Sequence, residues 1–337
     1  MTELSVVVPC YNEEEALPVF FNEMIPVLDN LVDHEWEMIV VDDGSSDGTL
    51  GLIRGLSRVD ARVRGVALSR NFGHQPALDA GLAFASGECI AVVDCDLQDP
   101  PDVLAHLVRR VRNEGYDVCY AVRRRREGPL ILRVLYRIFY RLIRNIAEHP
   151  WPLDAGDFSA FNRRTLHALL ALPENIRMLR GLRAWVGLRQ AAVAYDRPPR
   201  AAGRSKYNLA RLTSLAIRAF VGFSYLPLRI ASMIGLVTAL LSALVAGFFV
   251  LNRMIPGITP FGYYVGANPG TTTIVVLFLL MNSILFLCLG IIGEYVAVIT
   301  REIKGRPAAI VRETIGSPAL QSHRFPILLL GDAKRLE

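Results

Sequence analysis

Three aspartates follow an apolar run in the segment DCDLQDPP, which covers residues 94–101. The preceding residues, Cys89–Val93, are typical of a buried strand, and carboxylates at its end are unfavourable unless a positive group meets them. Asp94 and Asp96 are expected at positions i and i+2 of an extended segment, so that both side chains point the same way. Two such carboxylates suit a divalent metal that also binds phosphate oxygens, and Gln98 adds a neutral oxygen. The alternative is a polar strand end capped by aspartates.

Two further polar clusters follow apolar runs. Asp42 and Asp43 precede the turn sequence GSSDG, and their carboxylates are suited to accept hydrogen bonds from ribose hydroxyls or base N–H groups. Tyr11 and Asn12 follow the first apolar run and offer a stacking surface and amide hydrogen bonds to a base. By themselves Asp42 and Asp43 also fit a capped turn. Together the three clusters indicate a nucleotide-diphosphate site with a metal beneath the phosphates.

The elements that must position these clusters alternate between strand-like and helix-like patterns over residues 1–120. Strands are predicted at Leu4–Val8, Glu37–Val41, Val63–Leu68 and Cys89–Val93, and helices at about 14–31 and 75–85. This alternation predicts an α/β fold with a parallel, doubly wound sheet. Ligands of such sheets bind beyond the carboxyl ends of the strands, so we expect Pro9–Glu13, Asp42–Ser45 and Asp94–Asp99 to meet at one edge. Neither a dinucleotide fingerprint nor a P-loop motif is present.

The second half of the chain is unusually apolar. Of the 337 residues, Ile230–Leu251 form a run of 22 without a charge, which as a helix reaches ~33 Å. Ile274–Gly293 form a second uncharged run of 20 residues. A buried core helix is the alternative, but core helices of this length usually carry a polar stripe. The sequence therefore predicts two membrane spans.

The distribution of basic residues predicts their orientation. Basic residues flank the two runs at Arg218, Arg229, Arg301, Lys304, Arg306 and Arg312, whereas the connecting loop carries only Arg253. The positive-inside rule then places both termini and the polar domain in the cytoplasm, as parts of an integral protein of the plasma or inner membrane. The amino terminus lacks the pattern of a signal peptide. Five cysteines show no metal or disulfide spacing, as expected in a reducing compartment.

A local excess of arginine stands out against the modest net charge of +5. Eight arginines fall within residues 123–144, against one acid, Glu127. Arginines repeat every three or four residues in 130–147, so one face of a helix there would be cationic and the others apolar. Such an amphipathic helix suits the headgroup layer of a bilayer, although it would also pack on the domain's own core. Leu209–Leu226 is predicted to be a second interfacial helix.

Five motifs carry a resemblance to a known family. PCYNEEE, VVDDGSSDGT, SRNFGHQ, DCDLQDPP and GRSKYN occur in this order before the apolar runs. In this arrangement the chain resembles the family 2 glycosyltransferases, and more narrowly the polyprenyl-phosphate glycosyltransferases such as dolichyl-phosphate mannose synthases and bactoprenol glucosyltransferases. The match covers about residues 4–312. It implies a GT-A (Rossmann-like) fold, a nucleotide-sugar donor, bound Mg²⁺ or Mn²⁺, and inversion at the anomeric carbon.

The resemblance also implies roles for individual residues. Those around the base and ribose would be Pro9, Tyr11, Asn12, Glu13 and Asp42, with Asp94 against the nucleotide. Asp94, Asp96 and Gln98 would hold the metal. On the acceptor side stand Arg204, Ser205, Lys206 and Tyr207 of GRSKY, where a lipid headgroup would arrive. Arg123 begins a second basic cluster that extends to Arg126, which would equally well be a solvated run.

Transfer to a lipid phosphate makes particular demands. A phosphate monoester has a second pKa near ~6, so its oxyanion is already available at neutral pH. The obstacle is the approach of two anions, which calls for cations on both reactants, and Arg204 and Lys206 are the candidates on the acceptor side. Asp157 matches the position of a family carboxylate near the acceptor, where it would orient the phosphate or take a remaining proton. It is preferred to Asp154.

The sequence thus predicts a cytoplasmic GT-A domain over 1–208, a juxtamembrane helix over 209–228, two transmembrane helices within 229–300 and a cytoplasmic tail over 301–337. The expected partners are a nucleotide sugar, a polyprenyl phosphate and the bilayer, without nucleic acid. Gly235, Ala239, Ala243 and Gly247 have a spacing suited to close helix packing and hint at homo-oligomers. UDP-glucose and undecaprenyl phosphate are favoured as substrates, with UDP-N-acetylglucosamine, UDP-galactose and GDP-mannose as open donors. The alternatives are a processive polysaccharide synthase, whose Q-x-x-R-W motif is missing, and an inactive nucleotide-sugar-binding scaffold.

Overall fold

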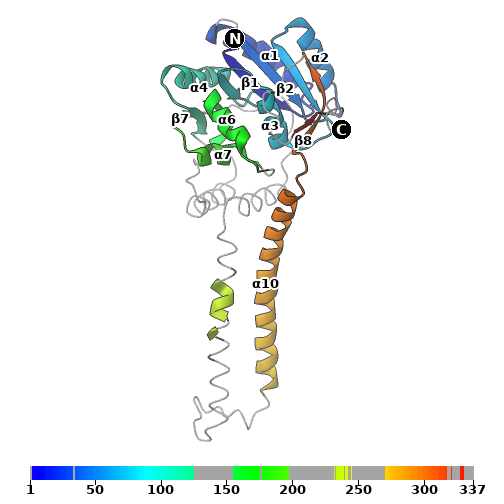
Figure 1. Ribbon diagram of the computed structural model, residues 1–337, viewed down its shortest axis with the longest axis vertical. Helices are drawn as coiled ribbons and strands as arrows, with labels where there is room; N and C mark the ends of the chain where they lie inside the picture. Colours follow the sequence, from blue (N-terminus) through cyan, green and yellow to red (C-terminus); the bar gives the residue numbers. More distant parts are fainter. Residues whose placement is uncertain are drawn as a thin grey trace. The chain divides into compact units, whose positions relative to one another are not determined.

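The chain divides into two compact units in the computed structural model (Figure 1). The first unit comprises Met1–Asn208 and Lys304–Glu337, and the second comprises Leu209–Ile303. The structure describes residues 2–32, 35–124, 155–174, 177–196, 270–316 and 327–329, together with 231, 233–238, 240–241, 244 and 320. The predicted interfacial helix at 130–147, the juxtamembrane helix at 209–228 and most of the first apolar run lie outside these residues.

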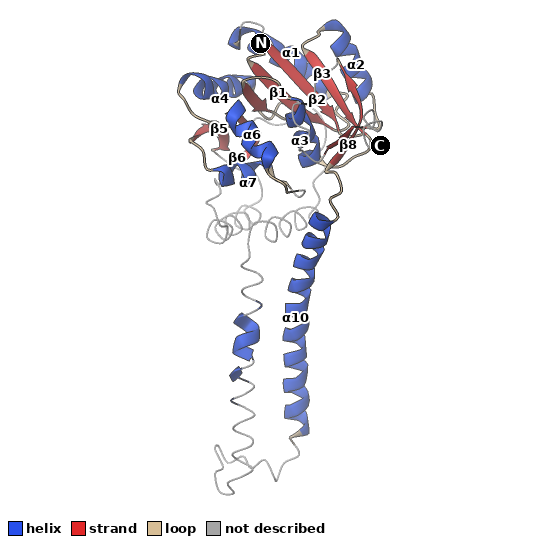
Figure 2. Cartoon of the chain, in the orientation of Figure 1, coloured by secondary structure: helices blue, strands red, loops and turns tan. Residues whose placement is uncertain are grey.

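The first unit is built on a nine-stranded mixed sheet in the order β7-β5-β6-β4-β1-β2-β3-β8-β9 (Figure 2). Its strands are β1 (Leu4–Cys10), β2 (Trp36–Asp42), β3 (Val63–Leu68), β4 (Cys89–Val92), β5 (Val118–Arg123), β6 (Ala155–Asn162), β7 (Gln190–Tyr195), β8 (Ala309–Ile315) and β9 (Ile327–Leu329). The four central strands β4, β1, β2 and β3 are mutually parallel. The predicted parallel α/β sheet is confirmed there, and each of the four predicted strands lies within two residues of its observed bounds.

Helices cover both faces of this sheet. Those of the first unit are α1 (Ala16–Leu31), α2 (Thr49–Val59), α3 (His74–Phe84), α4 (Pro101–Asn113), α6 (Arg163–Ala171) and α7 (Leu179–Val186). Alternate residues of a strand point to opposite faces, so Val6 and Val8 face α1, α2 and α4, whereas Val7 faces α3. The helix α3 packs closely enough that a Cβ on Gly81 would lie 2.4 Å from Val7 Cγ1. This contact shows that α3 lies close against the sheet at Gly81.

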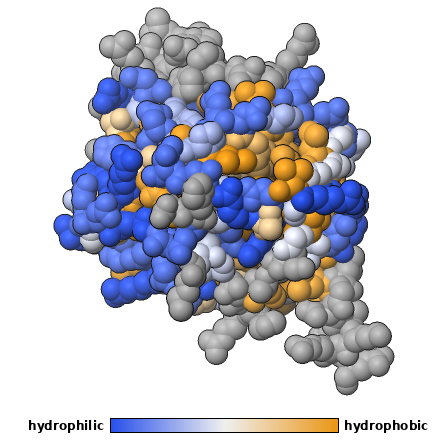
Figure 3. Space-filling model, turned by 90° about the horizontal axis from the view of Figure 1, so that it is seen from above, coloured by the Kyte–Doolittle hydropathy of each residue, from blue (hydrophilic) through white to orange (hydrophobic). Residues whose placement is uncertain are grey.

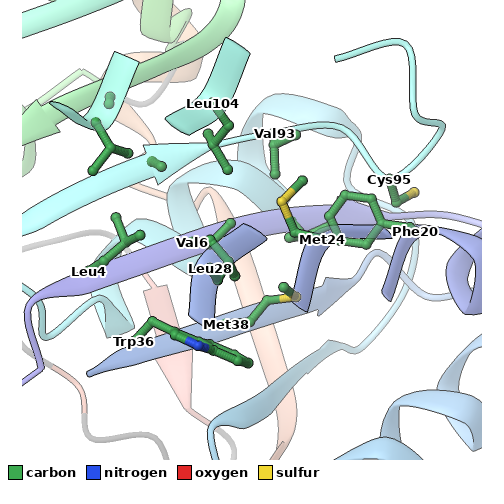
Figure 4. Close-up of a cluster of buried hydrophobic side chains, with 14 of the residues drawn as sticks. Leu4, Val6, Phe20, Met24, Leu28, Trp36, Met38, Val93, Cys95 and Leu104 are labelled. Atoms are coloured by element: carbon green, nitrogen blue, oxygen red, sulfur yellow. The ribbon is translucent and has the colours of Figure 1, made fainter. Parts of the chain in front are cut away.

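The main core lies between the central strands and α1 and α4. Phe20 and Met24 of α1 pack against Val6 and Leu104 in a cluster of buried side chains (Figure 4). Cys95 belongs to the same cluster and is 4% exposed, so the residue between the two aspartates is part of the core. On the outer surface, hydrophilic residues surround smaller hydrophobic patches in the view of Figure 3. The strands are buried on both faces because helices cover both, which explains their nearly continuous apolar sequences.

The C-terminal segment adds two strands to the sheet of the first unit, which the sequence did not indicate. β8 pairs antiparallel with β3, and β9 pairs parallel with β8. Val311 of β8 is buried, and Glu313 forms an ion pair with Arg54 of α2 at 2.6 Å. Residues 309–315 therefore form a strand of the first unit rather than a free tail.

The second unit contains the long helix α10 (Thr271–Ile303). It includes the whole second apolar run, and many of its apolar side chains are exposed, among them Ile274, Phe278 and Phe286. Cys288 Sγ donates a hydrogen bond to the carbonyl of Ala231, at 3.5 Å. Within the residues that the structure describes, no helix meets the length and apolarity required of a membrane span.

Candidate active site

The first two polar clusters meet at the carboxyl ends of β1 and β2. The Asn12 N–H donates to Ser45 Oγ at 2.9 Å, and Asn12 Oδ1 accepts from the Ser46 N–H at 2.8 Å. The Glu13 N–H donates to Thr49 Oγ1 at 2.9 Å. Asn12 adopts a φ of 53°, which asparagine tolerates better than most residues. The loop after β1 is therefore tied to the turn after β2, and the Asn12 side chain helps to join them.

Asp42 offers an unsatisfied oxygen in this region. Its carboxyl is almost fully buried, Oδ1 accepts from the Ser45 N–H at 3.1 Å, and Oδ2 has no hydrogen-bond partner among the residues that the structure describes. A buried acceptor without a partner is costly and rare in a folded protein. Tyr11 directly follows Cys10, the residue of β1 that pairs with Asp42, and 37% of its surface is exposed. An exposed ring and an unfilled carboxylate oxygen fit the predicted base and ribose site.

The DCDLQDPP segment does not continue β4 in extended form, so the prediction that Asp94 and Asp96 point the same way from a strand is wrong. β4 ends at Val92, and the Asp94 N–H donates to Asp99 Oδ2 at 3.3 Å. The Gln98 N–H donates to Asp96 Oδ1 at 3.2 Å, and Leu97 has a φ of 56°. These local hydrogen bonds fold the segment into a turn, which the aspartates favour.

The two aspartates consequently differ in exposure. The Asp94 side chain is 37% exposed, whereas Asp96 is 8% exposed as a residue. Within the described ranges, no group of three or more histidine, cysteine, aspartate or glutamate side chains could hold a metal ion by itself. A metal at Asp94, Asp96 and Gln98 would thus take further ligands from a bound diphosphate.

Asp43 fixes the beginning of α3. Its Oδ1 accepts from the Phe72 N–H at 2.7 Å and its Oδ2 from the Gly73 N–H at 2.9 Å. Gly73 has a φ of 105°, a conformation for which glycine is suited. Burial raises the pKa of Asp43, although the two N–H groups oppose this shift. The carboxyl caps the helix that follows and places His74 at its first turn.

His74 lies close to the carboxylates of both Asp94 and Asp157. Its Nε2 is 3.8 Å from Asp94 Oδ1 and 3.6 Å from Asp157 Oδ2. The surrounding protein disfavours the charged imidazole, but the hydrogen bond to Asp157 and the charge of Asp94 prevail and raise the pKa of His74 to about 9. The structure thus brings Asp94, from the turn after β4, and Asp157, from β6, close to the same cation.

Asp157 is also held by Gln75. Gln75 Nε2 donates to Asp157 Oδ2 at 2.7 Å, while Gln75 Oε1 accepts from the Leu179 N–H at 2.8 Å. One amide therefore links α3, β6 and the start of α7. The other oxygen, Asp157 Oδ1, is buried and has no hydrogen-bond partner in the described part of the chain.

Two arginines of α7 surround the same carboxylate. Burial alone would raise the pKa of Asp157, but the hydrogen bond with His74 and the charges of Arg180 and Arg183 hold it well below its usual range. Arg183 is fully buried, and its burial lowers its pKa to about 10 although Asp157 opposes the shift. Asp157 is therefore a permanently ionised group at neutral pH and a weak base.

Arg123 closes the side of the site near β5. The Tyr195 hydroxyl donates to Asp99 Oδ1 at 3.1 Å, and Tyr195 packs edge-on against Phe158. Burial disfavours the charge on Arg123, yet its hydrogen bond with Tyr195 and the charges of Asp99 and Asp94 raise its pKa. The predicted basic residue thus lies near the turn that carries Asp94.

The site combines predicted and unpredicted residues. Predicted members at this edge of the sheet are Pro9, Tyr11, Asn12, Glu13, Asp42, Asp94, Asp96, Gln98, Arg123 and Asp157. Arg204, Ser205, Lys206, Tyr207 and Asp154 lie outside the described residues. Sequence reasoning missed the roles of His74, Gln75, Arg180 and Arg183. The motif SRNFGHQ pointed to the first two, but no local pattern linked them to Asp157.

The chain is similar to several known proteins. Residues 5–170 match the model of glycosyl transferase family 2. An uncharacterized glycosyltransferase of Synechocystis is 37% identical over 93% of this chain and 96% of its own length. A prophage-derived bactoprenol glucosyl transferase of Shigella flexneri is 34% identical over 93% of this chain and 98% of its own. Glucosyl-3-phosphoglycerate synthase of Mycobacterium tuberculosis, solved with Mn²⁺ and UDP-glucose, aligns over 65% of this chain and 78% of its own with 23% identity and a TM-score of 0.45. The family model and the two relatives above 30% identity show that the chain belongs to glycosyl transferase family 2.

Proposed function

We propose that this glycosyltransferase moves a hexose from a nucleotide sugar to a polyprenyl phosphate, with inversion at the anomeric carbon. The observation that carries the proposal is the near full-length similarity to proteins named bactoprenol glucosyl transferase, at 34% identity. UDP-glucose and undecaprenyl phosphate are the favoured substrates. The finer choice among donors rests on the resemblance of the motifs.

The donor side of the site fits a nucleotide diphosphate. Asp42 Oδ2 is a buried acceptor without a partner, which a ribose hydroxyl or a base N–H would satisfy. Tyr11 supplies an exposed ring for stacking. Asp94 follows the neighbouring strand β4, where it would lie beside the diphosphate of the donor.

The residues at Asp94 fit a divalent metal that is shared with the donor. Carboxylate and amide oxygens are ligands that Mg²⁺ and Mn²⁺ prefer, and Asp94, Asp96 and Gln98 supply such atoms. Mg²⁺ usually binds through one or two carboxylates plus substrate phosphates, which suits this small acidic set. When bound, the metal would offset the charge of the leaving diphosphate.

The acceptor needs no strong base. An oxygen of its phosphate attacks C1 of the sugar, the bond from C1 to the diphosphate oxygen breaks, and the nucleoside diphosphate leaves. At neutral pH this phosphate is mostly a dianion, because its second pKa is near ~6. Asp157 is a poor proton acceptor because His74, Arg180 and Arg183 hold its pKa low. We therefore assign it to positioning rather than to proton removal.

We further propose that the two apolar runs anchor the enzyme in the bilayer where its acceptor resides. Neither Ile230–Leu251 nor Ile274–Gly293 carries a charge. Apolar side chains of α10 such as Ile274 and Phe278 are exposed, and insertion into the bilayer would remove them from water. The basic flanks favour a cytoplasmic catalytic domain and cytoplasmic termini.

The direct test is transfer of labelled sugar. Membranes that contain the enzyme are incubated with UDP-[¹⁴C]glucose and undecaprenyl phosphate, and the label in an organic extract is measured. We expect label in an acid-labile lipid for the wild type and a loss of at least about 100-fold in Asp96→Asn, since electrostatic stabilisation of the leaving group is worth that much. Binding of the nucleotide sugar without transfer would support the scaffold instead, and a panel of the other three donors identifies the sugar.

A further inference from the structure

Residues 177–183 carry three arginines at intervals of three. The first, Arg177, makes contacts that join α6 to α3. Arg177 is buried, and its Nε lies 3.2 Å from Asp79 Oδ1 in α3. Its Nη groups donate to the carbonyls of Leu169 and Leu172 at 2.9 and 3.0 Å. This arginine binds the end of α6 to α3 and has no capacity left for a ligand.

The third arginine is fully buried and closed to a ligand, whereas the second is only half-buried. Arg183 is fully buried, its Nη2 donates to the Gly156 carbonyl at 3.3 Å, and its guanidinium lies 4.9 Å from the Tyr120 ring centre. Arg180 is half-buried and makes no hydrogen bond or ion pair with any residue in the described ranges. Its Nε–H is buried without an acceptor, which an arginine extended freely into water would avoid.

The position of Arg180 is set by the amide that links three elements. Leu179, the preceding residue, donates its N–H to Gln75, and Gln75 donates in turn to Asp157. The charge of Arg180 acts on both Asp157 and His74. The start of α7, and with it the backbone of Arg180, is therefore tied through Gln75 to Asp157.

The charges at this point leave an excess of positive groups for an incoming anion. Asp157 carries one negative charge and is already contacted by Gln75 and His74 and balanced by the buried Arg183. Arg180 also acts on Asp157, but Asp157 and Asp94 together carry two negative charges against the three positive groups His74, Arg180 and Arg183. A guanidinium presents a planar fork of N–H donors that matches phosphate oxygens.

We propose that Arg180 binds the phosphate monoester of the acceptor lipid and holds its nucleophilic oxygen near the donor, a role that rests on the function proposed above. Gln75 and Asp157 act through it as positioning residues, because they fix the start of α7 against α3. Arg180 forms no covalent bond in this role. It offsets the repulsion between the two anionic reactants, as a cation on the acceptor must.

The test separates acceptor binding from donor binding. Full-length Arg180→Gln, Arg180→Lys and the matched control Arg164→Gln are compared, where Arg164 is an exposed arginine of α6. We expect KM for undecaprenyl phosphate to rise at least tenfold in Arg180→Gln and less in Arg180→Lys, which keeps a point charge. The Kd for UDP should stay within twofold, and Arg164→Gln should match the wild type in both.

Each other outcome has a definite meaning. If the wild type transfers no sugar to undecaprenyl phosphate, the proposed function fails and this assignment fails with it. If the wild type transfers sugar but Arg180→Gln keeps its KM, or loses UDP affinity instead, only the assignment of Arg180 is wrong. Thermal melting of each variant shows whether it folds, and if Arg180→Gln does not, an unchanged KM in Arg180→Lys combined with weaker UDP binding contradicts the proposal.

Discussion

At the scale of single residues, Asp157 shows how surroundings decide a chemical role. A carboxylate near an acceptor is a natural candidate for a general base. Here its Oδ2 meets Gln75 and His74, and two arginines lie close by, so that the carboxylate has little affinity for a proton. An already ionised phosphate makes such a base unnecessary.

This leads to a prediction for the pH dependence of the reaction. A folded-state pKa well below the usual value keeps Asp157 ionised at all pH values near neutrality, so its protonation should not limit the rate there. We expect kcat/KM to fall below about pH 6, where the acceptor phosphate gains its second proton. The Asp157→Asn variant should keep the same acid limb and lose less than about 100-fold in rate, below the usual cost of removing a general base.

The measurement is the pH profile of kcat/KM for both forms between pH 5 and 8. An acid limb that disappears in Asp157→Asn would show that this carboxylate does accept the proton. The Arg164→Gln variant serves as the control for a change of charge elsewhere on the same face of the domain.

Sequence reasoning succeeded for residues close to strand ends and failed where contacts span long separations. Asp42 and Asp94 were predictable because polar residues follow apolar runs at the carboxyl ends of parallel strands. The grouping of Gln75 with Asp157 and Leu179 joins residues roughly 80 to 100 positions apart, and no local period reports such a contact. The turn at Asp94 was missed because hydrogen bonds of Asp96 and Asp99 compete with the strand.

At the scale of elements, the placement of α3 controls the site, because this helix carries both His74 and Gln75 at its start. Gly81 allows the close approach, since a Cβ there would meet Val7 Cγ1 at 2.4 Å and Val41 Cγ2 at 2.9 Å. Both neighbours are central β-branched core residues that cannot move away easily. Because Gly81 has no side chain, α3 can pack closely against the sheet.

We predict that Gly81→Ala lowers the free energy of unfolding by about 1–3 kcal/mol, the usual cost of overpacking a core. The matched control is Gly55→Ala in α2, where a Cβ would meet nothing within 4 Å. That change should be neutral or stabilise by up to ~1 kcal/mol, because alanine is the better helix former. Thermal melting of the purified variants compares the two, and equal effects would contradict the close packing of α3.

The edge strand β8 marks a limit of sequence analysis at this scale. Its pattern AIVRETI alternates weakly, and nothing local indicates that it pairs with β3, more than 240 residues earlier. The pairing depends on the chain returning to the sheet after α10. The family resemblance ended near residue 312 and gave no guide beyond it.

At the scale of the whole molecule, the proposed function combines a sugar-nucleotide site with a membrane anchor. We predict that the loop between the apolar runs faces the outside, since Arg253 is its only basic residue. A cysteine at Asn268→Cys should react with a membrane-impermeant maleimide in intact cells. A cysteine at Ala333→Cys should react only after permeabilisation, with the wild type as the control for its five native cysteines. Labelling of the 333 position in intact cells would reverse the predicted topology.

The central claim is that the nucleophile is the ionised phosphate of a lipid. The most direct measurement compares undecaprenyl phosphate with undecaprenol, the same lipid without its phosphate, as acceptors for labelled sugar from the nucleotide donor. The account predicts label in the extracted lipid only when the phosphate is present. Equal transfer to the free alcohol would contradict it, because a hydroxyl would need the strong base that Asp157 is not.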